Sequence, residues 1–76
     1  MHLLYATIRR LKEAKLYFSL DTYRGDAVTI SVTVPGERIE IEIFADESVE
    51  IARFRGSELD STDPSLIDEI IETFKD

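Results

Sequence analysis

Four runs of alternating apolar residues constrain the fold of this chain more than any other feature of its sequence. They lie between residues 16 and 54 and consist of Leu16, Phe18 and Leu20; Val28, Ile30, Val32 and Val34; Ile39, Ile41 and Ile43; and Val49 and Ile51. Alternation with a period of two is typical of strands that bury one face and expose the other. We therefore predict four strands that share one apolar face and one polar face.

Helical periodicity flanks these runs on both sides. Before them, Leu4, Ile8 and Leu11 recur at helical spacing. After them, Asp63-Pro64 provides a capping acceptor and a proline at the first helical position, which together favour a helix start. The apolar stripe of that second helix consists of Leu66, Ile67, Ile70, Ile71 and Phe74.

These elements predict an α+β fold in a single domain over residues 1–76. The expected order is a helix, a four-stranded antiparallel meander and a second helix, with both helices packed on one face of the sheet. Residues 55–62, between the last apolar run and the second helix, have the composition of a polar loop.

The apolar pattern also selects the turns, because directly opposed residues of a hairpin share a face. A two-residue turn at Pro35-Gly36 pairs the second run with the third. Three-residue loops at Arg24-Gly25-Asp26 and Ala45-Asp46-Glu47 form the other two hairpins, and the last residue of the later loop is expected in a left-handed conformation. This register places Glu42 directly opposite Glu50 on the polar face.

The turn Val34-Pro35-Gly36-Glu37-Arg38, together with residues 16–20, 27–28 and 44–55, resembles a group of short bacterial proteins of uncharacterised function. That group shares a Val-Pro-Gly-Glu-Arg turn, an acidic hairpin and an acidic C-terminal helix. The resemblance implies a bacterial origin and a shared fold, and it provides no functional residues. The sequence departs from the group at Glu47, where the group usually has glycine, and at Ile39, where an aromatic residue is common.

Charge is distributed unevenly along the chain. Residues 1–24 hold five basic and two acidic side chains, a net of +3, whereas residues 25–76 hold four basic and fourteen acidic ones, a net of −10. An acidic surface repels phosphate backbones, so we expect no nucleic-acid partner and regard a basic protein as the natural complement. The simpler interpretation is that the acidic side chains only keep a small domain in solution.

Membrane association is not expected from this sequence. No run approaches the roughly 20 apolar residues of a membrane span, and the apolar start is interrupted by Arg9-Arg10, which makes it too short for a signal peptide. We therefore expect a soluble, cytoplasmic protein.

The sequence also lacks the residue patterns that usually carry catalysis or metal binding. It contains no cysteine, and its only histidine, His2, stands at an end that is expected to fray. No glycine-rich phosphate loop or calcium loop is present. Asp21, Glu42 and Glu50 share a row on the polar face, but a flat sheet offers a metal ion too few converging oxygens. We expect no enzyme activity, no cofactor and no metal.

The polar face of the predicted sheet is therefore the candidate site. Its acidic side chains and the aromatic side chains at its rim are suited to contact a basic partner protein. The predicted contact residues are Tyr17, Asp21, Glu40, Glu42, Glu50 and Phe54. The expected function is a small acidic protein-interaction module, such as an antitoxin-like or immunity-like inhibitor. The alternative is a self-associating structural or accessory subunit that uses an edge strand or the polar face.

Overall fold

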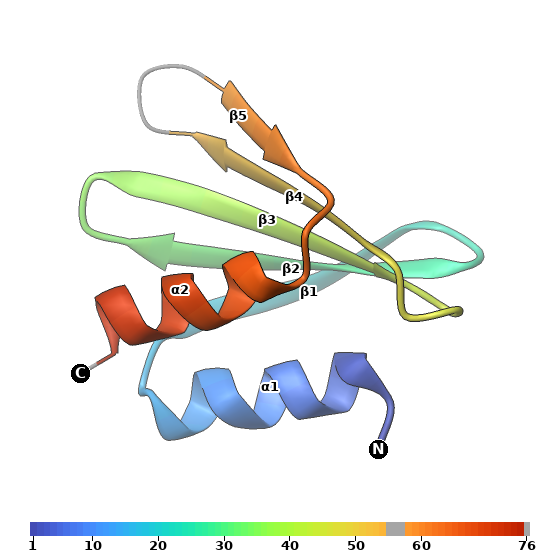
Figure 1. Ribbon diagram of the computed structural model, residues 1–76, viewed down its shortest axis with the longest axis horizontal. Helices are drawn as coiled ribbons and strands as arrows, with labels where there is room; N and C mark the ends of the chain where they lie inside the picture. The colour runs from blue at the N-terminus through green and yellow to red at the C-terminus, as the bar shows by residue number, and fades with distance from the viewer. Residues whose placement is uncertain (55–57, 76) are drawn as a thin grey trace.

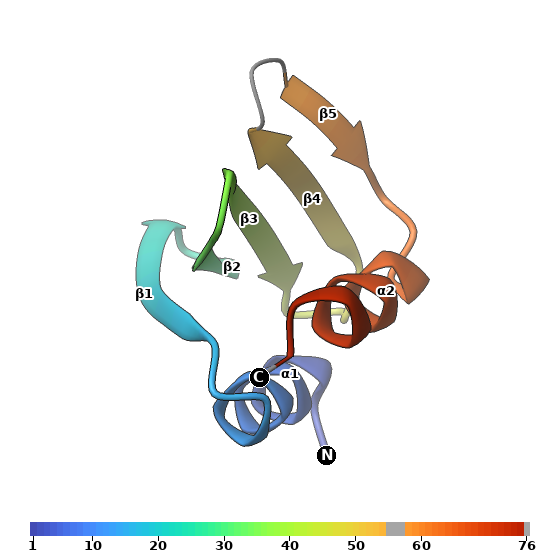
Figure 2. The same cartoon turned by 90° about the vertical axis from the view of Figure 1, so that its left-hand side faces the viewer.

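The computed structural model describes residues 1–54 and 58–75 of the chain. Its elements follow in the order α1 (Leu3–Glu13), β1 (Tyr17–Arg24), β2 (Ala27–Val34), β3 (Glu37–Phe44), β4 (Val49–Phe54), β5 (Glu58–Ser61) and α2 (Ser65–Phe74). The strands form one antiparallel sheet in the order β1-β2-β3-β4-β5. The two helices lie side by side on one face of this sheet and run in the same direction (Figures 1 and 2). Within the described residues, neither helix is long and apolar enough to cross a membrane.

The sheet has five strands, so the expectation of four is wrong. The fifth, β5, lies where the polar composition of residues 55–62 predicts a loop; residues 55–57 of that segment are outside the described part of the chain. β5 pairs with β4, with Glu58 opposite Phe54 and Asp60 opposite Ala52. An edge strand of this kind is held by backbone hydrogen bonds on one side and needs no apolar alternation of its own.

The hairpins on either side of β3 confirm the register that the apolar pattern predicts. Val34 lies opposite Glu37 across the turn, and Gly36 has φ +84°, as the second central residue of a type II turn requires. The next hairpin places Ile43 opposite Val49, and Glu47 has φ +70° at the last loop position. A slip of one residue in either hairpin would exchange the two faces of the sheet.

The β1–β2 hairpin has the predicted register but a different turn. From Tyr17 to Asp21 the pairs with β2 are those that the sequence predicts. The turn, however, joins Arg24 directly to Ala27 as neighbours across the ladder, so the expectation of a three-residue loop is wrong. The additional residue is taken up by a bulge in β1 between Asp21 and Arg24. The bulge allows the Arg24 guanidinium to lie 5.0 Å from the centre of the Phe44 ring.

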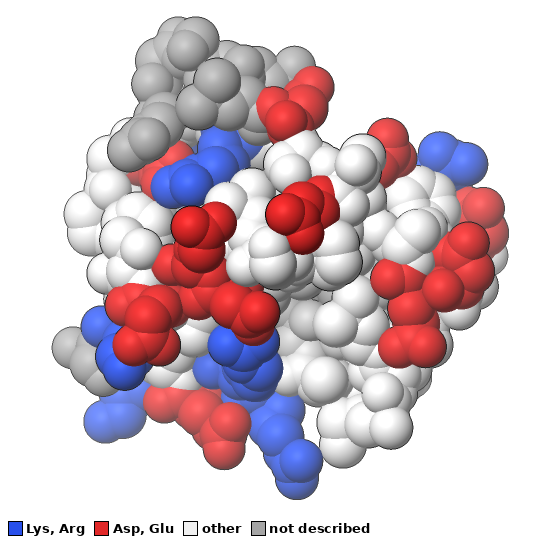
Figure 3. Space-filling view, viewed as in Figure 1, with Lys and Arg blue, Asp and Glu red and all other residues white. Residues whose placement is uncertain are grey.

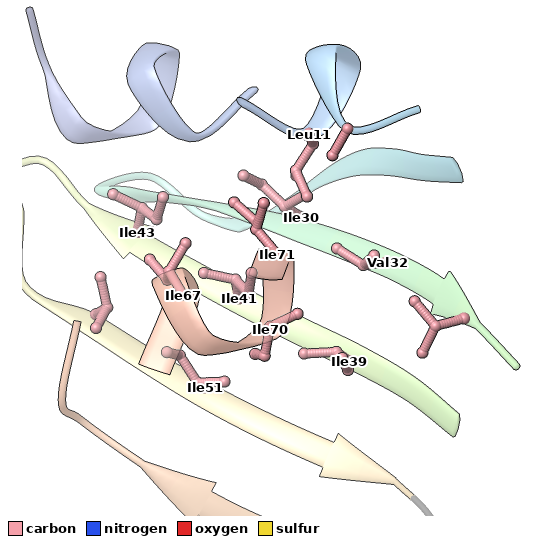
Figure 4. Packing of buried hydrophobic residues seen from close by; sticks show 13 residues of the cluster. Leu11, Ile30, Val32, Ile39, Ile41, Ile43, Ile51, Ile67, Ile70 and Ile71 are labelled. Carbon is pink, nitrogen blue, oxygen red and sulfur yellow. The ribbon is translucent and has the colours of Figure 1, made fainter. Parts of the chain in front are cut away.

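The core lies between the helices and the covered face of the sheet. Figure 4 shows Ile67 and Ile70 of α2 directed toward β3 and β4, and Ile71 directed toward Ile30 of β2. Leu11 of α1 lies over Ile30. The buried cluster is entirely aliphatic and consists of Leu11, Ala14, Ile30, Val32, Val34, Ile39, Ile41, Ile43, Val49, Ile51, Ile67, Ile70 and Ile71.

An ion pair closes one end of this core. Arg53 lies opposite Ile39 on the covered face and donates two hydrogen bonds to Glu37, with Nη2–Oε1 and Nε–Oε2 distances of 2.5 and 3.3 Å. The side chains of Glu37 and Arg53 are only 3% and 19% exposed. The two-point contact compensates for removing both charges from water.

Two exposed aspartates stabilise turns through hydrogen bonds. Asp63 accepts hydrogen bonds from the backbone N–H and the hydroxyl of Ser65, at 3.0 and 2.9 Å. These bonds cap the start of α2, where Pro64 already has helical backbone angles. Asp46 accepts bonds from the hydroxyl and N–H of Ser48. These bonds hold the pKa of each carboxyl below its ordinary value of 3.8. Each carboxylate therefore stabilises the fold above that pH, and the contribution is lost as the pH falls through the lower folded pKa.

The start of α1 is attached to the β3–β4 turn. His2 accepts a hydrogen bond from the Leu4 N–H at Nδ1 (3.1 Å), and Nε2 donates to the Ala45 carbonyl (3.0 Å). The Glu47 carboxylate accepts a bond from the Leu3 N–H at 2.7 Å. This end of the helix is therefore held by three hydrogen bonds where fraying is expected. Glu47 therefore makes this contact from a left-handed position, with φ +70°.

The other left-handed residue, Lys15, terminates α1. Its N–H bonds to the Lys12 carbonyl, and the Leu16 N–H bonds to the Leu11 carbonyl, both at 3.1 Å. These two bonds form a Schellman motif, in which the left-handed position usually holds glycine. Lys15 has φ +61°, and its exposed side chain makes no hydrogen bond or ion pair within the described residues.

We expect the two left-handed positions, Lys15 and Glu47, to respond differently to substitution by glycine. Lys15→Gly removes only backbone strain, so we expect it to raise the free energy of unfolding by about 0.5–1 kcal/mol. Glu47→Gly removes the same strain together with the cap on Leu3, so we expect no gain. Urea unfolding of both variants measures the difference. An equal gain in both would show that the Glu47 carboxylate does not hold α1.

Candidate functional site

The face of the sheet away from the helices contains a groove of about 580 Å³. It crosses all five strands and ends beside the residues that follow β5. The groove is lined by Tyr23, Thr29, Glu40, Glu42, Glu50, Ile51, Ala52, Asp60, Ser61 and Thr62. Four of these ten residues are acidic, and none is lysine or arginine.

The strand register places the four carboxylates. Glu40 and Glu42 are two residues apart on β3 and therefore point to the same face. Glu42 lies directly opposite Glu50 of β4, as the sequence predicts. Glu40 lies opposite Ala52, which in turn lies opposite Asp60 of β5. The small alanine side chain thus separates two carboxylates in the same row.

The floor and one end of the groove are formed by β2 and β1. Thr29 lies opposite Glu42 and is only 5% exposed, although it is on the face without helices. Tyr23 lies in the β1 bulge, where its 71% exposed side chain lines the groove. The bulge thus contributes an aromatic wall to an acidic groove.

The carboxylates of the groove lack close cations in the part of the chain that is described. Glu42, Glu50 and Asp60 form no ion pair with a described lysine or arginine. Glu40 has one long contact, 3.8 Å to Nε of Arg38. The Arg38 guanidinium lies over the Phe54 ring, 4.8 Å from its centre. The groove therefore keeps an excess of negative charge. Because Glu42 and Glu50 lie opposite each other across β3 and β4, their repulsion destabilises the free protein.

Three of the six predicted contact residues line the groove and three do not. Glu40, Glu42 and Glu50 lie together along it. Asp21 is exposed on the same face, opposite Thr29, but outside the lining.

The two predicted aromatic contacts lie at the far end of the same face. Tyr17 is 74% exposed at the start of β1, and Phe54 lies beneath Arg38 at the end of β4. Neither lines the groove. They belong to the row that contains Arg38, whereas the groove lies over the acidic rows.

Sequence reasoning missed the part of the groove that β5 provides. Asp60, Ser61 and Thr62 line it, but residues 55–62 have no apolar alternation to indicate a strand. Thr29 and Tyr23 are on the predicted polar face. Nothing in the sequence, however, indicates that Thr29 is buried there or that a bulge directs Tyr23 into the groove.

The carboxylates of the groove lie in rows that run across β3, β4 and β5. Within the described residues, no three histidine, aspartate or glutamate side chains come close enough together to hold a metal ion. The carboxylates are instead spread along the groove. Such a row can contact several separate cationic groups of one elongated ligand.

Comparisons of the chain with models of protein families, with curated proteins and with solved structures give no significant match. The resemblance to a group of short bacterial proteins stays an expectation. The functional interpretation below therefore depends on the geometry and charge of the groove.

The opposed glutamates predict a specific effect on stability. Because Glu50→Gln removes one of two directly opposed like charges, we expect it to raise the free energy of unfolding by about 0.3–1 kcal/mol at low salt. At 1 M salt, where the Debye length is about 3 Å, the gain should shrink. Denaturant titrations at both salt concentrations measure this. Glu69→Gln, on α2, changes the net charge equally and serves as control; an equal gain there would refute repulsion within the groove.

Proposed function

We propose that the groove binds a basic segment of a partner protein, and that the chain acts as a small acidic interaction module of the antitoxin-like or immunity-like kind. The observation that carries this proposal is the lining of the groove: four carboxylates and no basic residue. A ligand with lysine or arginine side chains would relieve the repulsion between these carboxylates on binding. Because this repulsion destabilises the free protein, its relief would favour the complex.

A second acidic surface of the molecule differs from the groove in this respect. Figure 3 shows acidic side chains over α2 beside basic ones over α1. Asp68 of α2 forms an ion pair with Arg10 of α1, and Glu72 pairs with Lys75 at 2.9 Å. Two of the acidic residues of the helices, Asp68 and Glu72, thus have cations from the chain itself.

The spacing of the carboxylates favours an extended ligand. Residues two apart on a strand are separated by about 7 Å along it. Glu40 and Glu42 have this spacing on β3, and Glu50 faces Glu42 from β4. An extended segment with basic side chains at alternate positions would match the spacing, and Tyr23 would contact the aliphatic parts of those side chains.

A titration with a defined basic peptide tests the proposal. We expect a peptide with lysine at alternate positions to shift the ¹⁵N–¹H resonances of the groove, measured by NMR at low salt. The residues expected to respond are Thr29, Glu40, Glu42, Glu50, Ala52 and Asp60. The triple variant Glu40→Gln, Glu42→Gln, Glu50→Gln should bind at least about tenfold more weakly, a loss of about 1.4 kcal/mol.

A variant with the same change in net charge controls for non-specific attraction. Glu13→Gln, Glu69→Gln and Glu72→Gln change three exposed glutamates on the helices. This variant should keep the affinity of the unchanged protein. If both triple variants lose affinity equally, or if the shifts spread over α2, the groove is not the binding site.

A further inference from the structure

The two edges of the sheet differ in length, charge and exposure. β5 has four residues, two of them acidic and none basic. β1 has eight residues, of which Asp21 and Arg24 carry opposite charges. Every side chain of β1 except Phe18 is exposed. Because β1 has a neighbour on one side only, the N–H and C=O groups of alternate residues point away from the sheet without a strand to bond them.

The side chains of β1 are unusually apolar for a free edge. Leu20 lies opposite the fully buried Ile30, on the face that the helices cover elsewhere, yet it is 48% exposed. Tyr17 and Tyr23 are 74% and 71% exposed. A natural edge strand is commonly protected by charge or proline. On β1 the protecting features are Asp21, Arg24 and the bulge between them, all at one end of the strand, and they leave Tyr17 to Asp21 in regular pairing geometry.

We propose that β1 pairs with β1 of a second copy of this chain, antiparallel and centred on Ser19, so that the two sheets become one sheet of ten strands. In this register Ser19 lies opposite the partner's Ser19, and Phe18 lies opposite the partner's Leu20. The contact between Phe18 and Leu20 extends the apolar face across the junction. Tyr17 faces the partner's Asp21, so no like charges are opposed. A two-fold axis through Ser19 makes the interface closed and self-complementary.

Charge opposes a second copy less at β1 than at β5. The whole chain carries −7, so two copies repel over most of their surfaces. β1 itself holds Asp21 and Arg24, whose charges cancel, whereas β5 holds two acidic residues and no basic one. Two copies that meet at β1 therefore repel each other less than two copies that meet at β5. The β1 edge is separate from the groove lining except at Tyr23, so the dimer is proposed independently of the basic partner.

Sedimentation velocity from micromolar to millimolar concentration tests for the dimer. We expect the sedimentation coefficient to rise with concentration to that of a dimer. Leu20→Lys changes an exposed side chain and should shift the transition to at least tenfold higher concentration. Tyr5→Lys, at a 63% exposed position on α1, is the matched control and should behave as the unchanged protein. A monomer at all concentrations, or equal dimerisation of the Leu20→Lys variant, would overturn the proposal.

Cysteine cross-linking tests the register. The chain has no cysteine, so any disulfide in a single-cysteine variant joins two copies. Opposed residues of antiparallel strands have Cα atoms about 4.5–5.5 Å apart, within the range that a disulfide spans. Ser19→Cys should therefore form a covalent dimer under mild oxidation, whereas Tyr17→Cys should stay monomeric. Gel electrophoresis without a reducing agent distinguishes the two forms. Equal or faster cross-linking of Tyr17→Cys, or no cross-linking of Ser19→Cys, would contradict this register.

Discussion

The register of the antiparallel strands is the constraint on which the rest of this structure depends. A shift of one residue between two strands would move the isoleucines of β3 into water and its glutamates against the helices. The turn at Gly36, with φ +84°, and the three-residue loop ending at Glu47 fix that register on both sides of β3. The aliphatic core and the acidic groove are consequently two faces of the same pairing.

Three irregular positions of the chain make contacts outside the regular strand pairing. The bulge in β1 places Tyr23 at the groove. The left-handed Glu47 attaches the start of α1 to the sheet through its carboxylate. At the end of the covered face, the charged residue Arg53 stands where the other strand positions are apolar, and it forms an ion pair with Glu37. Each of these features departs from a local preference and is offset by a contact that the regular strand could not make.

The sequence predicts the strands that have an apolar face and is silent about the strand that has none. The alternation of Ile39, Ile41 and Ile43 suffices to identify β3 and to pair it with both neighbours. β5 contains only one apolar residue, Leu59, so its pairing with β4 depends on backbone hydrogen bonds that composition does not report. The positions of Glu40, Glu42 and Glu50 in the groove follow from the predicted register, and the part that includes Asp60 does not.

Exposure of Leu20 shows a second limit of sequence patterns. Alternation predicts which face a side chain is on, but it does not predict whether a helix or another strand covers that position. Leu20 shares a face with Ile30, yet it is half exposed because β1 is the last strand of the sheet. The position of a strand within the sheet depends on all the strand pairings together. The alternation in one strand therefore does not predict whether that strand lies at the edge.

One continuous register unites the five strands and brings Asp60 beside the carboxylates of β3 and β4. Cross-strand nuclear Overhauser effects in the isotopically labelled protein test it most directly. The structure predicts contacts between the backbone protons of Ala52 and Asp60, together with contacts between Glu42 and Glu50. Contacts displaced by one residue in either pair, or none between β4 and β5, would contradict the account.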